Sequence, residues 1–154
     1  MAQLHLICGL PGAGKTTLAR RLERELPGLR LSPDEWLIRI MGLRLSPDGT
    51  SNGPFRDAVE GIQFELGLRL VAEGLNVILE NGFWTREERD GLRARAKDAG
   101  VPVMLHYAHA PIDELRRRLE QRNANLPQGT YPISDEVFEL ALRWFQAPAP
   151  DEFA

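Results

Sequence analysis

A short glycine-rich run near the start of the chain carries the residue types that bind phosphate. Residues 9–16 read GLPGAGKT and match the pattern G-x-x-x-x-G-K-[ST]. Glycines let the backbone wrap around phosphate oxygens, with several N–H groups pointing inward. Lys15 would reach the β- and γ-phosphates of a nucleoside triphosphate, and the Thr16 hydroxyl would be a ligand of Mg²⁺. The alternative interpretation is a glycine-rich turn with a solvated lysine. The residues expected to bind nucleotide are Gly9, Leu10, Pro11, Gly12, Ala13, Gly14, Lys15, Thr16 and Thr17.

Two carboxylates stand at the ends of later apolar runs. Asp34 follows the run Leu29–Ser32, and Glu80 ends a third run. Ligands of parallel sheets bind at the carboxyl ends of the strands, so both acids are expected beside the phosphates. Asp34 is the candidate base for an incoming hydroxyl, or else only an acid in a first helical turn. Glu35 is expected to face solvent. Glu80 is the candidate metal ligand beside Thr16, or else an acid paired with an arginine.

Basic residues gather in the segment LRRRLEQRN. Arg118 and Arg122 are four residues apart and lie on one helical face, where they can stabilise charge on a transferring phosphoryl group. Arg116 and Arg117 are interpreted as a solvated basic face. The arginines and the following loop predict a short lid over residues 116–133 that excludes water.

The segment GFWTREER, residues 82–89, follows the third apolar run. Phe83 and Trp84 are expected either to line an acceptor pocket or to join the core, and both alternatives stay open. Arg86 is a candidate anchor for an anion. Trp144 and Phe145 are expected to pack the last helix against the core.

The elements that must position these residues alternate between strand and helix. Repeated strand–helix units indicate a parallel sheet with both faces covered. The fold class is therefore α/β, a three-layer P-loop NTPase sandwich with about four or five strands. Residues 42–54 are expected to form a loop, and Thr85 and Ser134 to cap helices. The expected strands are Leu4–Cys8, Leu29–Ser32, Asn76–Asn81 and 101–108, and the expected helices are Lys15–Leu26, Pro33–Met41, 55–73, Arg86–Ala99, 111–123 and 135–145.

Length and composition favour a single domain over residues 1–154. No apolar run approaches the roughly 18 residues of a membrane span, and no basic leader precedes the first apolar stretch. The single cysteine, Cys8, cannot form an internal disulfide. These features favour a cytoplasmic protein. The net charge is −3, which disfavours general nucleic-acid binding.

The sequence resembles a group of small, AAA-like P-loop kinases that includes phage polynucleotide kinase, chloramphenicol phosphotransferase and zeta toxins. The segments that carry the resemblance are GLPGAGKTTLARRL, LSPDEW, VILENGFWTREER and LRRRLEQRN. The resemblance implies ATP, Mg²⁺ and transfer of phosphate to a hydroxyl acceptor. It also implies that Asp34 is the general base and that Arg118 or Arg122 is the lid arginine.

Two positions depart from the pattern of this group. The group often has an aspartate where this chain has Glu80. Its polynucleotide kinases place an arginine three residues after the catalytic aspartate, whereas this chain has Leu37 there and Arg39 two residues further on. We therefore expect an ATP-dependent kinase that acts on a small hydroxyl-bearing molecule. The alternatives are a 5′-hydroxyl polynucleotide kinase and a nucleotide-binding switch with slow hydrolysis.

Overall fold

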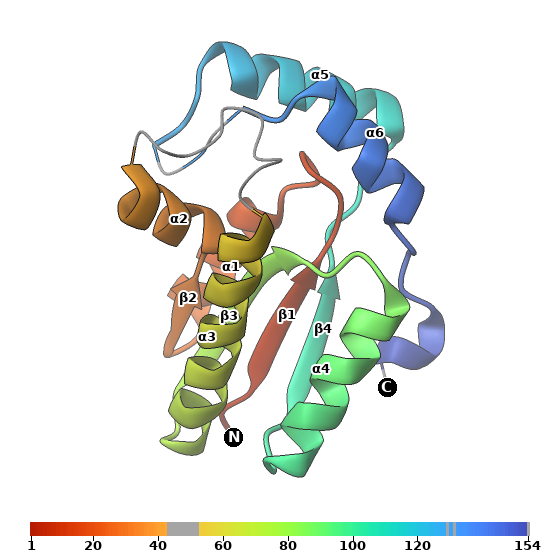
Figure 1. The fold of residues 1–154 in the computed structure, drawn as a ribbon. Coiled ribbons are helices and arrows are strands. Elements are labelled where there is room, and N and C mark those ends of the chain that lie inside the picture. Colours follow the sequence, from red (N-terminus) through yellow and green to blue (C-terminus); the bar gives the residue numbers. More distant parts are fainter. Residues whose placement is uncertain (43–52, 129, 131, 154) are drawn as a thin grey trace.

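The computed structural model describes residues 1–42, 53–128, 130 and 132–153. Strands and helices alternate through most of the chain, and the last two helices follow the final strand (Figure 1). The strands are β1 (Leu4–Cys8), β2 (Gly28–Leu31), β3 (Asn76–Gly82) and β4 (Val103–Tyr107). The helices are α1 (Lys15–Glu25), α2 (Pro33–Met41), α3 (Gly53–Ala72), α4 (Arg86–Asp98), α5 (Ile112–Ala124), α6 (Asp135–Trp144) and the 3₁₀ helix η3 (Pro150–Phe153).

The strands form one parallel sheet in the order β2-β3-β1-β4. Leu4 of β1 pairs with Val77 of β3 on one side and with Val103 of β4 on the other. Within the described ranges the sheet has four strands, which confirms the lower of the two predicted numbers. Because every strand runs the same way, all four carboxyl ends meet at one edge of the sheet.

Helices cover both faces of the sheet, as predicted for strand–helix repeats (Figure 1). One face packs Leu4 and Leu6 against residues of α3 and α4, among them Phe64 and Ala96. The opposite face packs Ile7 and other residues against α1. Helices α5 and α6 lie across the carboxyl edge of the strands (Figure 1). This edge is therefore the part of the molecule where side chains from many elements meet.

Local sequence signals account for the helix boundaries. Ser32, Thr85 and Ser134 each accept a hydrogen bond from a backbone N–H three residues on, which confirms the two predicted caps and adds a third. The predicted loop over 42–54 lies mostly outside the described residues. In the part of the chain that the structure describes, no helix is both long and apolar enough to span a lipid bilayer.

Candidate active site

A cleft of about 1290 Å³ opens at the carboxyl edge of the sheet. It is lined by residues 11–17 of the phosphate loop and by residues of the other strand ends, of α2 and α3, and of the lid segment. The predicted site residues Lys15, Asp34, Glu80, Arg118 and Arg122 all line this one cleft. The strand order thus brings together side chains that are far apart in sequence.

The backbone of the phosphate loop has the conformation that its glycines allow. Gly12 and Gly14 have φ values of 82° and 94°, in the left-handed region that favours glycine. Gly9 is needed for a different reason: the backbone of Ala108 lies so close that a Cβ at Gly9 would be 2.4 Å from the Ala108 carbonyl oxygen. The loop leads directly into α1, so the N-terminus of that helix faces the cleft.

Lys15 lies at the floor of the cleft. Its Nζ donates a hydrogen bond of 2.9 Å to the carbonyl oxygen of Leu10 within the loop. Burial lowers the pKa of Lys15 to about 8, although the nearby carboxylates of Asp34 and Glu80 oppose this shift. Lys15 is therefore held where an incoming triphosphate would restore its full charge.

The two predicted lid arginines both reach the phosphate loop region. Arg118 Nη1 donates to the carbonyl oxygen of Gly12 at 3.3 Å, while its Nε donates to Glu114. Arg122 is half-buried, lines the cleft, and lies close enough to Lys15 to lower that residue's pKa.

The neighbouring arginines of α5 have other partners. Arg116 pairs with Glu139 at 2.5 Å, and Arg117 pairs with Glu114 at 2.6 Å. Both side chains are at least 41% exposed, which agrees with the predicted solvated face. Only the face with Arg118 and Arg122 turns toward the cleft.

Asp34 lies in the first turn of α2 and faces Arg56 of α3. Arg56 Nη1 is 2.6 Å from Asp34 Oδ1, and its Nε is 2.9 Å from Glu60 Oε1. Burial raises the pKa of Glu60 to about 7, with Arg56 opposing the shift. Sequence patterns alone do not single out Arg56 or Glu60, because their contacts depend on how α2 and α3 pack together.

Glu80 lies near both Thr16 and an arginine, so the structure fits both of its predicted roles: metal ligand and partner of an arginine. Its Oε1 accepts a 2.7 Å hydrogen bond from Arg30, as in an ion pair. Burial raises its pKa, and Arg30 with the hydroxyls of Ser32 and Thr16 opposes that rise. Its other oxygen, Oε2, is buried without a hydrogen-bond partner among the residues described. A carboxylate oxygen lacking a donor, next to the Thr16 hydroxyl, fits Mg²⁺, which prefers oxygen ligands.

Glu35 also departs from expectation. Its side chain is 35% exposed and its Oε1 is 2.7 Å from Arg30, so it faces solvent only in part and is held in an ion pair. Arg30 is therefore shared between Glu35 and Glu80 at the end of β2. An arginine within an otherwise apolar strand was the available signal for this buried ion pair.

Aromatic residues form part of the cleft wall. Phe83 is 2% exposed, packs in the core and also lines the cleft, so both alternatives for it hold. The Trp84 indole lies over Gly82, where a Cβ would be 2.9 Å from Nε1. Trp144 is 58% exposed and lines the cleft, so its predicted role in the core is wrong. Phe145, for which the same role was predicted, does pack against the core, and its ring stacks with Tyr107.

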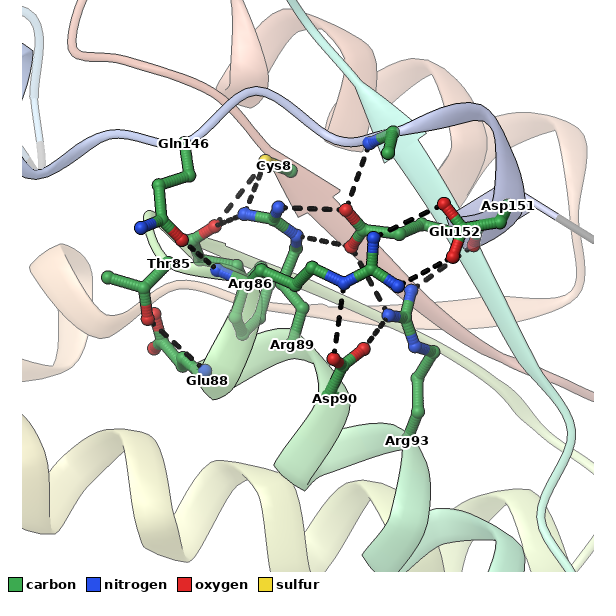
Figure 2. Close-up of polar contacts among 12 residues, drawn as sticks. Cys8, Thr85, Arg86, Glu88, Arg89, Asp90, Arg93, Gln146, Asp151 and Glu152 are labelled. Atoms are coloured by element: carbon green, nitrogen blue, oxygen red, sulfur yellow. Dashed lines mark hydrogen bonds and ion pairs between the residues drawn. The ribbon is translucent and has the colours of Figure 1, made fainter.

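The C-terminal strap, residues 145–153, binds arginines of α4, the helix that begins just after Phe83 and Trp84 (Figure 2). Arg89 of α4 is fully buried, and its Nη1 donates to the carbonyl oxygens of Phe83 at 2.9 Å and Trp84 at 3.3 Å. Its other nitrogens bind the carboxylate of Glu152 at 2.7 and 3.0 Å. The strap thus holds a loop that contributes to the cleft.

Arg86 belongs to the same network. It is bound by Asp151 at 2.5 Å and by Asp90 at 3.3 Å, on the outside of α4 (Figure 2). Its predicted role as an anchor for an anion is therefore replaced by a link to the strap.

Comparison with known proteins agrees with this geometry. The AAA_33 family, described as an AAA domain, matches residues 4–148. The chain belongs to this family. Shikimate kinase from Paracidovorax citrulli (strain AAC00-1) is 30% identical over 138 residues, spanning 78% of this chain and 74% of that protein. The resemblance to small P-loop kinases is confirmed.

Solved structures support the fold. Chaetomium thermophilum Kti12 in complex with ADP-AlF3 superposes with a TM-score of 0.74 at 21% identity, covering 96% of this chain and 82% of that chain. Mycobacterium tuberculosis APS kinase CysC, in complex with AMPPNP and APS, superposes with a TM-score of 0.62 at 20% identity. That match covers 96% of this chain and 83% of that chain. Both structures contain a bound nucleotide.

Proposed function

We propose that this member of the AAA_33 family transfers the γ-phosphate of ATP to a hydroxyl group of a small molecule. The observation that carries the proposal is the joint placement of Lys15, Asp34 and the two lid arginines around one cleft. The similarity to shikimate kinase supports a small-molecule kinase in general. A phosphate loop alone would serve hydrolysis equally well, so the proposal depends on Asp34.

The proposed transfer uses Asp34 as the base and Lys15 with the arginines as the groups that stabilise charge. The acceptor oxygen attacks the γ-phosphorus, the bond from that phosphorus to the β-phosphate oxygen breaks, and ADP leaves. Asp34 takes the hydroxyl proton, and the products are ADP and a phosphate monoester. Lys15 and the arginines stabilise the negative charge on the transferring group.

Mg²⁺ would be held by Thr16 and Glu80, together with phosphate oxygens. When bound, it supplies neutralisation of charge on the β- and γ-phosphates. Arg30 positions Glu80 through its 2.7 Å contact with Oε1, while Oε2 has no hydrogen-bond partner among the residues described.

The test follows label from γ-labelled ATP into a small-metabolite extract, a 5′-hydroxyl oligonucleotide and water. Asp34→Asn should lower transfer by at least about a hundredfold, because general bases contribute roughly 10²–10⁴-fold, while ATP binding by calorimetry persists. Lys15→Ala should lose both phosphate transfer and ATP binding. Label found on the oligonucleotide would favour a polynucleotide kinase, and label found only as free phosphate would favour a switch.

A matched pair of arginine variants sharpens the test. Arg122→Gln should lower the transfer rate, because Arg122 lines the cleft beside Lys15. Arg116→Gln should leave the rate unchanged, because Arg116 is exposed and bound to Glu139. Equal effects of the two variants would contradict the assignment of the lid face.

A further inference from the structure

Charge is divided between the two ends of the cleft. The end at the phosphate loop contains Lys15, Arg118 and Arg122, which suits a triphosphate. The part formed by α2, α3 and the start of α4, called the acidic end, contains carboxylates, of which Asp34 lies near enough to Lys15 to raise that residue's pKa. These carboxylates are Asp34, Asp57, Glu60 and Glu88. If ATP occupies the basic end, the acceptor must lie at the acidic end.

Among the described residues that line the acidic end, carboxylates outnumber basic groups. Arg56 is shared between Asp34 at 2.6 Å and Glu60 at 2.9 Å. Within the described ranges, no ion pair joins Asp57 or Glu88 to an arginine or lysine, and the Glu88 carboxylate accepts hydrogen bonds from the backbone N–H groups of Thr85 and Trp84. These acids repel one another, since Asp57 and Glu88 both raise the pKa of Glu60. An acceptor with a negative charge would increase this repulsion.

A side pocket of about 190 Å³ branches from the acidic end of the cleft. Asp57, Glu60 and Glu88 line it together with the apolar rings of Phe64 and Phe83. The one basic residue among its described lining residues is Arg95, which stacks over Phe64 at 4.5 Å and is 3.8 Å from Glu65. The pocket therefore offers negative charge and an apolar wall to a small group.

Asn81 gives an independent sign of a ligand. This residue follows Glu80 at the end of β3 and lines both the cleft and the side pocket. Its Oδ1 is buried and has no hydrogen-bond partner among the residues described. A buried oxygen without a donor is costly, so a ligand that carries N–H or O–H donors would satisfy it.

We propose that the acceptor is a hydroxyl-bearing amine whose protonated amino group is held by Asp57, Glu60 and Glu88. The inference rests on the proposed kinase function and specifies the substrate class of that site. A protonated amine has no lone pair, so it cannot accept the phosphoryl group. The hydroxyl beside Asp34 is then the nucleophile, and the ammonium group serves for recognition.

The experiment uses a small-metabolite extract separated by ion exchange at pH 7 into cationic, neutral and anionic pools. Each pool is incubated with the enzyme and γ-labelled ATP, and labelled products are counted. The label should enter the cationic pool at least ten times faster than either other pool. Faster labelling of the neutral or anionic pool would overturn the substrate class and leave the kinase function intact. Label released only as phosphate with every pool would instead contradict the kinase function itself.

Variants test which residues recognise the amine. Asp57→Asn and Glu60→Gln should each lower labelling of the cationic pool about tenfold, the effect of losing one charge interaction of moderate strength. Glu73→Gln, an exposed acid at the far end of the α3 region, is the matched control and should have no effect. Unchanged labelling with both Asp57→Asn and Glu60→Gln would refute the assignment of the acidic end.

Discussion

Replacing Glu152 by alanine should destabilise the protein strongly, although Glu152 lies only two residues from the end of the chain. The side chains of Arg89 and Glu152 are 0% and 1% exposed. The carboxylate also accepts hydrogen bonds from Arg93 at 3.2 Å and from the backbone N–H of Ala149 at 2.9 Å. Glu152→Ala would leave the Arg89 guanidinium buried and bound to no carboxylate, with only two backbone carbonyls and the Cys8 sulfur as hydrogen-bond partners among the residues described.

Leaving one member of a buried ion pair uncompensated costs about 3–5 kcal/mol. For a domain of this size, each kcal/mol lowers the Tm by roughly 2–4 °C, so a fall of about 10 °C is expected. The control is Asp151→Asn, which breaks an exposed pair with Arg86 and should cost at most about 1 kcal/mol. Thermal unfolding followed by circular dichroism measures both variants.

The pH dependence provides a second check on the same pair. Arg89 lowers the pKa of Glu152 to about 2 in the folded protein. The difference in free energy of unfolding between wild type and Glu152→Ala should therefore have its maximum value above pH 4.5. It should shrink as pH falls from 4.5 toward 2. If Glu152→Ala and Asp151→Asn unfold at the same temperature at pH 7, the buried pair does not hold the strap.

Three further outcomes are expected. Because burial lowers the pKa of Lys15 to about 8, the Kd for ATP measured by calorimetry should rise about tenfold per pH unit above 8; a constant Kd from pH 7 to pH 9.5 would count against this. His5 Nδ1 and His106 Nε2 are 3.0 Å apart and burial lowers the pKa of both, so unfolding free energy should fall as pH drops below 6.5. Urea titrations should show a smaller fall for His106→Gln than for wild type, and equal falls would refute the coupling. Gly9→Ala should abolish ATP binding because its Cβ would lie 2.4 Å from a carbonyl oxygen, whereas Gly91→Ala, which has open space in α4, should add about 0.5–1 kcal/mol of stability in urea unfolding.

The sequence was sufficient to predict the strands, the helices and the phosphate loop, because all of these depend on local signals. Apolar runs, glycine stops and capping residues fixed the boundaries of the strands and helices to within a few residues. The motif at residues 9–16 specifies its own backbone conformation through its glycines. The four-residue spacing of Arg118 and Arg122 also predicted which face of α5 turns to the cleft.

The paired side chains could not be predicted in the same way. Arg56 meets Asp34 across 22 residues, Arg30 meets Glu80 across 50, and Arg89 meets Glu152 across 63. Periodicity identifies the buried face of each element, but a contact between two elements depends on how they are packed. Trp144 illustrates the same limit, because its hydrophobicity indicates burial and the packing of α6 leaves it at the cleft.

The contact between α5 and the phosphate loop explains how the lid arginines are brought to the phosphates. A Cβ at Gly12 would lie 3.1 Å from the carbonyl oxygen of Leu115, so a side chain there would push α5 away from the loop by a few tenths of an ångström. Ala13 packs in one cluster with Leu115 and Leu119, and Arg118 binds the carbonyl oxygen of Gly12. Folding of the loop and docking of α5 are therefore one packing event. The same glycine that opens the backbone to phosphate also sets the position of the arginines that face it.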